Sequence, residues 1–343
     1  MPGKDIIVVG TSSGGIEALQ QIARALPADF GGSLFIVLHT SPESPGFLPQ
    51  ILESVGPLPA TNAADGERTL PGRIYVAPPD HHMLLEPGRV RLTRGPKENR
   101  FRPAIDPLLR SAAQVYGPRV VGVVLTGNLD DGTAGLWAVK RLGGTAVVQD
   151  PEDALFPSMP RNAMRNVKVD YCVPLSGVAP LLVELARAPV AEEGVSDVPD
   201  EMEIEVRIAK QDNALEAGIM RLGEPSIFAC PDCHGVLLQL KDEKHVRFRC
   251  HTGHAYSPDS LLAEITETVE DSLWSSIRAI EETVLLLRQM AAHIKENHED
   301  GAAADLFIAR AQEAQRRADF VRQAVMKHEE LSEDKIRLAT KVS

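Results

Sequence analysis

The sequence predicts an α/β protein in which residues 1–188 form a mostly parallel, doubly wound sheet. Short β-branched apolar runs alternate with helical patterns throughout this range. The runs are almost continuously apolar, as strands are when helices cover both faces of a parallel sheet. After residue 188 an acidic, proline-containing stretch ends the alternation, which indicates that the α/β domain ends there.

Six apolar runs are the predicted parallel strands, and six helical patterns alternate with them. The predicted strands are Ile6–Val9, Ser33–Leu38, Arg73–Val76, Arg119–Leu125, Gly144–Val148 and Val169–Val173. The predicted helices are Ile16–Leu26, Phe47–Leu52, Ala104–Tyr116, Ala134–Leu142, Pro160–Arg165 and Ala179–Arg187. An antiparallel hairpin of Met83–Glu86 and Val90–Thr93 is expected at one edge of the sheet.

The rest of the chain divides into three predicted parts. Residues 189–222 are expected to be an acidic linker, residues 223–256 a zinc-binding segment, and residues 257–343 a helical tail. No internal repeat is visible.

Within the tail, Ser257 and Pro258 supply an N-cap and a first-turn proline for a helix that extends to about Asn297. Residues 300–301 (Asp-Gly) interrupt the pattern, and a second helix is predicted over about Ala303–Leu331. Apolar residues recur near heptad spacing on both helices, which favours an antiparallel helical hairpin.

Charge and composition exclude several classes of protein. The net charge is −12, and it belongs to the C-terminal part, because acidic and basic residues balance through residue 190. Nucleic acid is therefore not an expected partner. No apolar run is long enough for membrane insertion, and the N-terminus lacks a signal-peptide pattern, so a cytoplasmic location is expected. Four cysteines are too few for a disulfide scaffold of this size.

Ser12 follows the first predicted strand within GTSSGG, residues 10–15. The G-x-S-x-G spacing is typical of a nucleophile elbow, in which small residues permit a sharp turn and the hydroxyl is exposed at the carboxyl edge of the sheet. The helix that follows offers free N–H groups to a developing oxyanion. A glycine-rich turn after a first strand also occurs in nucleotide-binding modules, but those favour an acidic residue after the second strand, where this chain has His39.

His39 is the predicted general base for Ser12, since both residues follow parallel strands that end at the same edge of the sheet. The third group should be a carboxylate that fixes the imidazole tautomer. Asp130 and Asp131 both lie in the loop that follows the strand Arg119–Leu125, and the pattern alone does not choose between them.

The segment from Ile6 to Arg187 resembles the catalytic domain of the bacterial chemotaxis protein-glutamate methylesterases. The matching pieces occur in the family's order and are VVGTSSGGIEAL, IVLHTSP, GRIYVAPPDHHMLL, FRPAIDPLLRSAA, VVLTGNLDDGTAG and QDPEDALFPSMPRNAM. The resemblance implies that Ser12, His39 and Asp131 form the triad, because Asp131 occupies the aspartate of the family's L-T-G-x-x-x-D-G loop. In the same loop, residues 127–129 are Gly-Asn-Leu, which differs from the G-M-G that is commoner in the family.

The implied chemistry is hydrolysis of glutamate methyl esters on chemoreceptor cytoplasmic helices, with release of methanol, and deamidation of receptor glutamines, without a catalytic cofactor. The expected oxyanion and substrate-binding positions are Ser13, Gly14, His82 and Met159. For His82 the alternative is a structural histidine that caps the hairpin loop. Family members often carry an N-terminal receiver domain, whereas the catalytic pattern here begins at residue 5, so regulation by its own receiver is not expected.

Cysteine and histidine residues form a compact C-x₂-C-x₁₆-C-x₃-H pattern after the linker. Two ligand pairs on short turns suit tetrahedral zinc, and four protein ligands leave no open position, so the predicted role is structural. The predicted ligands are Cys230, Cys233, Cys250 and His254, with His251 as an alternative fourth ligand. The structural alternative is a set of thiols that binds no metal.

The helical tail is expected to be mainly the core of a helical hairpin. A functional alternative is association with a helical protein partner, or self-association, through its apolar stripe. For the chain as a whole, the non-enzymatic alternative is an inactive regulatory or scaffold protein of a chemosensory pathway.

Overall fold

The computed structural model describes residues 3–190, 197–210, 213–241, 246–296, 301–329, 331–332 and 336. Part of the predicted linker, the predicted helix end at Asn297 and the interruption at Asp300 lie outside these ranges. The chain divides into two compact units, Met1–Leu261 and Leu262–Ser343. Among the described helices, none has both the length and the apolar character that crossing a membrane would need.

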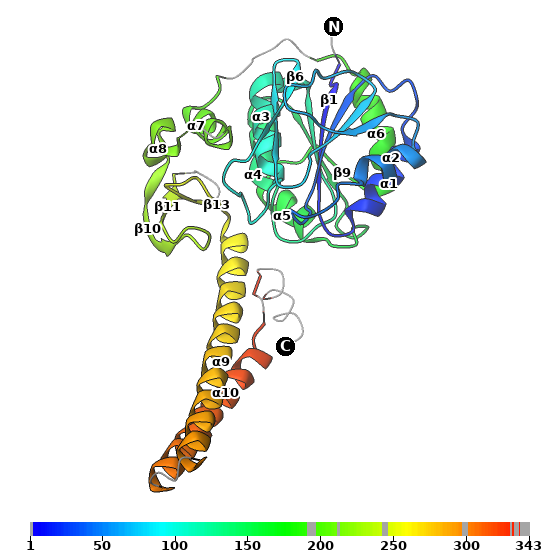
Figure 1. Cartoon of the computed structure of the whole chain (residues 1–343). Coiled ribbons are helices and arrows are strands. Elements are labelled where there is room, and N and C mark those ends of the chain that lie inside the picture. The colour runs from blue at the N-terminus through cyan, green and yellow to red at the C-terminus, as the bar shows by residue number, and fades with distance from the viewer. Residues whose placement is uncertain are drawn as a thin grey trace. The chain divides into compact units, whose positions relative to one another are not determined.

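A seven-stranded sheet forms the centre of the first unit (Figure 1), with the order β3-β4-β2-β1-β7-β8-β9. Every neighbouring pair in it is parallel. The strands are β1 (Ile6–Thr11), β2 (Ser33–Leu38), β3 (Ala60–Asn62), β4 (Arg73–Val76), β7 (Val120–Val124), β8 (Thr145–Gln149) and β9 (Tyr171–Val173). All residues of β1, β2, β7 and β8 are buried, as expected for strands covered on both faces.

Two layers of helices enclose the sheet. One apolar core joins the sheet to α1, α2 and α6, and a second joins it to α3, α4 and α5. These helices are α1 (Gly15–Ala25), α2 (Leu48–Val55), α3 (Ile105–Tyr116), α4 (Thr133–Arg141), α5 (Ser158–Asn166) and α6 (Leu175–Arg187). The mostly parallel, doubly wound α/β fold is thus confirmed.

The predicted hairpin forms, but it does not extend the central sheet. Strands β5 (His82–Glu86) and β6 (Arg89–Thr93) pair with each other in a two-stranded sheet that is separate from the seven-stranded one. The reason is apolar burial: Met83 and Leu85 are fully buried in the core that contains α3, and the Leu85 N–H donates to Ser111 Oγ at 3.0 Å. The hairpin therefore covers α3 instead of lying at a sheet edge.

The stretch expected to be a linker contains helices. Within it lie α7 (Asp200–Ala209), α8 (Ala214–Ala217) and the short 3₁₀ helix η2 (Ile219–Arg221). Met202 joins the core around α3, whereas Ile204 and Ile208 pack with Leu238 and Leu240 farther along the chain. The helix was not predicted because the stretch is rich in acidic residues. Through these contacts, α7 connects the α/β domain to the segment that follows.

A four-stranded antiparallel sheet follows α8, with the order β10-β11-β12-β13. Its strands are β10 (Gly223–Ala229), β11 (Val236–Leu240), β12 (Phe248–Cys250) and β13 (Ala255–Tyr256). Helix α9 (Pro258–Glu296) begins directly after it, and the first turn of α9 belongs to the first unit.

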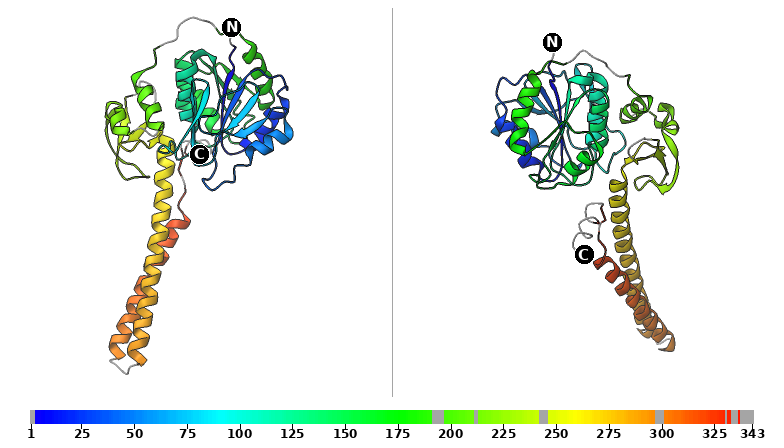
Figure 2. Two further views of the ribbon diagram at one scale, coloured as in Figure 1. Left: turned by 45° about the horizontal axis from the view of Figure 1, so that its top comes forward. Right: turned by 180° about the vertical axis from the view of Figure 1, so that it is seen from behind.

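The second unit is an antiparallel pair formed by the rest of α9 and by α10 (Gly301–Met326), which lie side by side in both views of Figure 2. Two ion pairs define the antiparallel direction, Lys295 with Asp305 at 3.6 Å and Arg322 with Glu281. From Ile277 to the end of α9, and along α10, the buried residues recur at intervals of seven, as in coiled-coil packing. They are Ile277, Val284 and Ala291 on α9, and Ala304, Ala311, Ala318 and Val325 on α10.

The strand order creates a switch point beside β1. The chain continues from β1 to β2 on one side and returns to β7 on the other. In open α/β sheets, ligands bind outside the carboxyl ends of the strands at such a point. The carboxyl ends of β1, β2 and β7 lead directly to Ser12, His39 and the loop that contains Asp131.

Candidate active site

Ser12 lies in a tight connection between β1 and α1. Gly14, with φ of 75°, occupies the left-handed region and precedes the helix, so a glycine is favoured there. The Ser12 N–H donates to the Thr126 carbonyl at 3.1 Å, which ties the serine to the residues after β7. At Gly127, an added Cβ would lie 2.9 Å from Ser12 Cβ and 2.1 Å from Met159 Sδ. Glycine at position 127 therefore makes room for both side chains.

His39 follows β2 and points its imidazole at Asp131. The His39 N–H donates to the Thr11 carbonyl at 3.2 Å, next to Ser12 in sequence. Its Nε2 lies 2.8 Å from Asp131 Oδ2, and its ring stacks on Phe101 with centroids 3.7 Å apart. Because Nε2 donates to the carboxylate, Nδ1 carries the lone pair. This Nδ1 is buried and has no hydrogen-bond partner among the described residues.

Asp131 is 1% exposed and receives an unusual number of donors. Besides His39, these are the N–H groups of Ile105 at 2.7 Å and Asp106 at 3.2 Å in the first turn of α3, the N–H of Gly132 at 3.0 Å, and Asn99 Nδ2 at 3.1 Å. The carboxylate thus also caps the N-terminus of α3, where a negative charge is favoured.

The two buried carboxyl groups at this point have opposite pKa shifts. Burial opposes ionisation of Asp131, but its hydrogen bond to His39, the charge of His39 and the donors of Ile105 and Asn99 outweigh that effect, so its pKa is lowered. Burial and the negative charge of Asp131 raise the pKa of Asp106 well above its ordinary value. Asp131 is therefore the member of the pair that carries the charge beside His39.

Asp130, the other acidic residue of the loop, is directed elsewhere. It accepts a hydrogen bond from Ser257 Oγ at 2.6 Å. The geometry thus separates the two aspartates that the sequence pattern left equivalent. Asp131 contacts His39, and Asp130 contacts the start of α9.

The remaining predicted site residues have different surroundings. Ser13 accepts a hydrogen bond from Asn128 Nδ2 on its Oγ at 3.2 Å, and its carbonyl accepts one from Thr126. Met159 is fully buried, and its N–H donates to the Gly127 carbonyl at 2.9 Å, so it packs next to Gly127, which in turn contacts the serine loop, residues 12–14 between β1 and α1.

His82 is fully buried, with Nε2 at 2.9 Å from the Pro96 carbonyl and Nδ1 accepting from the Ala104 N–H at 3.2 Å. Burial lowers its pKa. Both ring nitrogens are occupied, which favours the structural alternative for His82 over contact with a substrate.

The structure brings His39 and Asp131 into contact, whereas no hydrogen bond joins Ser12 Oγ to the imidazole in the described part of the chain. Two residues that the sequence analysis missed complete the surroundings, Asn99 against Asp131 and Phe101 against His39. The sequence signal for them is the FRPAID motif, which begins with Phe101 and follows Asn99 by two positions, in a stretch with no regular periodicity.

Cys230, Cys233, Cys250 and His254 converge at the turns of the antiparallel sheet, with their four ligand atoms within 4.8 Å of one another. Cys233 Sγ lies 3.6 Å from Cys250 Sγ, and His254 Nδ1 lies 3.5 Å from Cys250 Sγ. His251 is exposed and is not part of this group. The Cys₃His cluster can hold a metal ion, and of the two candidate histidines the geometry brings in His254.

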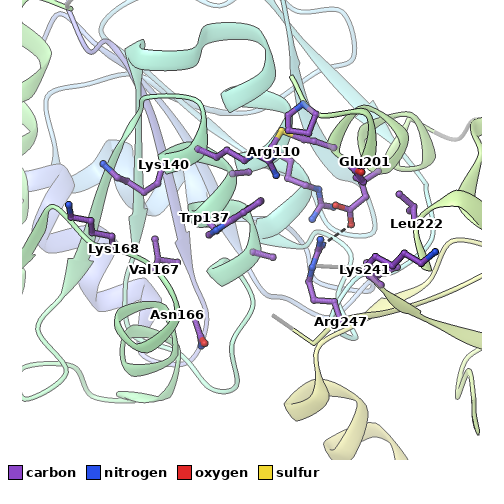
Figure 3. Close-up of a pocket in the computed structure, with 17 residues that line it drawn as sticks. Arg110, Trp137, Lys140, Asn166, Val167, Lys168, Glu201, Leu222, Lys241 and Arg247 are labelled. Atoms are coloured by element: carbon purple, nitrogen blue, oxygen red, sulfur yellow. Dashed lines mark hydrogen bonds and ion pairs between the residues drawn. The ribbon is translucent and has the colours of Figure 1, made fainter. Parts of the chain in front are cut away.

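A cavity of about 620 Å³, whose lining Figure 3 shows, includes none of the four cluster residues in that lining. Residues of α4, α7 and the antiparallel sheet line it, among them Trp137, Glu201 and Arg247. None of Ser12, His39 or Asp131 does so. Arg247 is engaged by Glu205 at 2.8 Å, and Arg141 lies over the ring of Trp137. The cavity thus lies between the α/β domain and the part of the chain formed by α7, residues 222–241 and Arg247.

A doubly wound parallel sheet with a serine and a histidine–aspartate pair at its switch point places this protein among the α/β hydrolytic enzymes. Residues 7–182 match the CheB methylesterase family. The chain belongs to this family.

Curated relatives and a solved structure support the same family assignment. A provisionally named protein-glutamate methylesterase/protein-glutamine glutaminase of Leptospira interrogans is 40% identical over 53% of this chain and 94% of its own length. A protein-glutamate methylesterase/protein-glutamine glutaminase of Anaeromyxobacter dehalogenans is 38% identical, but the match covers only 51% of it. The crystal structure of the Thermotoga maritima CheB methylesterase catalytic domain matches with a TM-score of 0.51 at 36% identity, over 53% of this chain and 98% of that one. All three matches fall on the α/β domain.

Proposed function

We propose that this protein is a serine hydrolase that removes methyl groups from glutamate γ-methyl esters on chemoreceptor cytoplasmic helices, and that Ser12, His39 and Asp131 carry the reaction. The observation that carries the proposal is the His39–Asp131 contact of 2.8 Å, which leaves a buried imidazole lone pair without a partner at the carboxyl edge of the sheet. A general base needs this state, and Ser12 is the hydroxyl that the neighbouring strand supplies.

In the proposed reaction, Ser12 Oγ attacks the ester carbonyl carbon while His39 Nδ1 accepts the serine proton. The bond to the methoxy group then breaks, and His39 returns the proton so that methanol leaves. Water, activated by the same imidazole, hydrolyses the acyl-serine and releases the glutamate. Asp131 stays ionised, holds the imidazole tautomer and stabilises the imidazolium. No cofactor takes part in these steps.

The developing oxyanion would be stabilised by the N–H groups of Ser13 and Gly14, which precede the eleven-residue helix α1. Its N-terminal dipole end favours negative charge. Deamidation of a glutamine would follow the same path with ammonia in place of methanol, as the names of the relatives suggest. Receptors with such side chains on their cytoplasmic helices are the proposed partners, and the cytoplasm is the proposed location.

For the Cys/His cluster we propose bound zinc with a structural role. Three thiolates and one imidazole fill a tetrahedral shell and leave no position for a reacting water. The antiparallel sheet around the cluster has a small apolar core, so a metal would supply much of its folding free energy.

One observation favours a second candidate, an inactive regulatory or scaffold protein of a chemosensory pathway. Ser12 Oγ is not hydrogen-bonded to His39 in the described residues. Apo sites often tighten only when substrate binds, so this observation weighs less than the His39–Asp131 contact. Turnover measurements separate the two candidates.

The test is methanol release from a methylated receptor fragment and from a short peptide that carries a glutamate γ-methyl ester. Ser12→Ala should lose at least about 10³-fold in kcat, as expected for removal of a triad nucleophile. Ser54→Ala, an exposed serine on α2, is the matched control and should keep wild-type turnover. Equal methanol release by wild type and Ser12→Ala would refute the proposal, and no release by wild type would favour the inactive candidate.

A further inference from the structure

A tight turn at residues 98–101 carries both side chains that touch the His39–Asp131 pair from outside the predicted triad. Glu98 and Phe101 exchange backbone hydrogen bonds at 3.2 and 3.0 Å. The two central residues, Asn99 and Arg100, have φ of 49° and 78°, as in the two-residue turns of β-hairpins. Asparagine tolerates this left-handed conformation better than most residues. The turn thereby presents Asn99 to Asp131 and Phe101 to His39.

The side-chain amide of Asn99 has a partner for each of its groups. Its Nδ2 donates to Asp131 Oδ1 at 3.1 Å and to Asp106 Oδ2 at 3.0 Å. Its Oδ1 accepts from the Ser257 N–H and from Ser260 Oγ, both at 3.1 Å. A backbone N–H can only donate and an ionised carboxylate can only accept, so these partners determine which way the amide faces.

Residues from β12 and β13 also contact this turn. The Asn99 N–H donates to the Ala255 carbonyl at 2.8 Å, and the Ala255 N–H donates to the Lys97 carbonyl at 3.2 Å. Glu98 is buried between Arg110 of α3 and Arg249 of β12, and Arg249 Nη2 lies 3.0 Å from its carboxylate. Arg249 is fully buried, so this ion pair is sheltered from solvent.

These contacts come from both ends of a short stretch that encloses two members of the Cys₃His cluster. Arg249 directly precedes Cys250, and Ala255 directly follows His254. Ser257 and Ser260 form the N-cap region and first turn of α9, where Ser257 Oγ also accepts from the Ser260 N–H at 3.0 Å. Residues 249–260 therefore act on the α/β domain as one folded element.

We propose that Asn99 is a positioning residue for the His39–Asp131 pair, and that residues 249–260 hold Asn99 in its working orientation. Turnover by the α/β domain then depends on a segment that lies outside the residues matched by the family. This inference rests on the proposed function, since it assigns Asn99 a role in the same reaction.

Loss of the Asn99 amide has a defined consequence for catalysis. Asp131 faces His39 from the end of β2 and Asp106 from α3, and buried His82 and Glu98 lie farther out. Without the Asn99 donor, one bond that favours the ionised carboxylate disappears while the burial of Asp131 continues to oppose its ionisation, so the pKa of Asp131 rises. His39 would then lose its negatively charged partner at a higher pH.

The experiment compares Asn99→Ala and Ser260→Ala in the full chain, with the glutamate γ-methyl ester peptide as substrate. Asn99→Ala should lower kcat by roughly 10- to 100-fold, the scale seen for outer-shell partners, while KM changes less than about 2-fold. The acidic limb of its pH–rate profile should move to higher pH. Ser260→Ala should also lower kcat and move the acidic limb to higher pH, each by a smaller amount. Ser276→Ala, on the exposed side of α9, is the control.

Wild-type kcat and an unshifted acidic limb in folded Asn99→Ala would overturn the inference. If Asn99→Ala does not fold, the same two results in Ser260→Ala overturn it. Ser12→Ala in the same assay distinguishes a failure of the proposed function from a failure of the role of Asn99. Full turnover by Ser12→Ala contradicts the proposed function itself, whereas an inactive Ser12→Ala beside a fully active Asn99→Ala contradicts only the role of Asn99.

Discussion

Gly127 lies in the loop after β7, tightly packed between Ser12 and Met159. A methyl group at this position would come 2.1 Å from Met159 Sδ and 2.9 Å from Ser12 Cβ, and both distances are too short for real contacts. Met159 is fully buried and cannot move into solvent, so the serine loop must shift instead.

Gly127→Ala should therefore lower kcat, and we expect a loss of about 10- to 100-fold, since displacement of reacting atoms by about 1 Å has this effect. Steady-state turnover of the ester peptide measures it. Gly31→Ala is the matched control, because nothing lies within 4 Å of the added methyl group there. Wild-type kcat in Gly127→Ala would show that the serine loop is not packed as described.

Asp131 should also leave a signature in the pH dependence of stability. Its pKa is lowered in the folded protein, so its ionised form stabilises the fold above the unfolded-state value, which is about 3.9. This contribution is lost as the pH falls through the lower folded-state pKa. Above pH 4 the raised pKa of Asp106 acts in the opposite direction, so only the acidic range isolates Asp131.

The free energy of unfolding of the wild type should thus fall more steeply than that of Asp131→Asn as the pH is lowered below about 4. Urea unfolding at several pH values measures both slopes, and the carboxyl groups other than Asp106, whose pKa depends on Asp131, are common to the two proteins. Equal slopes of unfolding free energy against pH in the two proteins would mean that Asp131 is not ionised in the folded state.

Among the elements, the antiparallel sheet β10-β11-β12-β13 should depend on metal. Its core contains Cys230 and Cys250 together with Leu237, Phe248 and Tyr256, which is little apolar surface for an independent fold. Protein purified without chelator should contain about one zinc per chain, and Cys233→Ser should lower both the zinc content and the Tm.

Cys172→Ser is the control for the metal prediction, because Cys172 lies exposed on β9, outside the cluster. It should retain zinc and stability. Zinc-free wild type of unchanged Tm would show that the cluster needs no metal.

Strands were the elements that the sequence predicted best. The bounds of β2 and β4 agree with the prediction to the residue, because each is a compact β-branched run between turn signals. Strand β3 was missed, since three residues, Ala-Thr-Asn, carry no apolar pattern. Helix α7 was predicted as linker because four of its ten residues are acidic and a proline precedes it, although five of its apolar residues are buried. The hairpin was predicted correctly, but its separation from the sheet depends on contacts with α3 that no local pattern encodes.

The candidate site was predictable only where it lies at strand ends. Ser12 and His39 directly follow buried strands, so the parallel topology places them at one edge. Asn99 donates to a residue 32 positions away and accepts from residues about 160 positions away. Such contacts need the folded C-terminal segment, and a single asparagine in a turn gives no signal of them.

At the scale of the whole molecule, the boundary between units determines where the tail can be removed. The first unit ends at Leu261, so residues 257–261 belong to the enzyme and only later residues form the separate helical pair. That pair exposes large apolar side chains, among them Trp274, Leu285, Leu286 and Phe320. We expect them to bind a helical partner or a second copy.

A chain that ends at residue 269 should therefore keep turnover of the ester peptide within about 2-fold and lose turnover of the intact receptor. Methanol release from the two substrates measures the split. A truncation before residue 257 would remove the contacts of Ser257 and Ser260 with Asn99 and is expected to reduce both activities. Equal loss of both activities on truncation at residue 269 would assign the tail a role in stability alone.

The most direct measurement of the central claim is whether Ser12 and Asp131 act as one catalytic unit although 119 positions separate them in the chain. It compares kcat for methanol release in Ser12→Ala, Asp131→Asn and the double variant, with Tm as the check on folding. Members of a triad are strongly non-additive, so the double variant should be no slower than Ser12→Ala. A double variant whose loss equals the product of the two single losses would contradict the account.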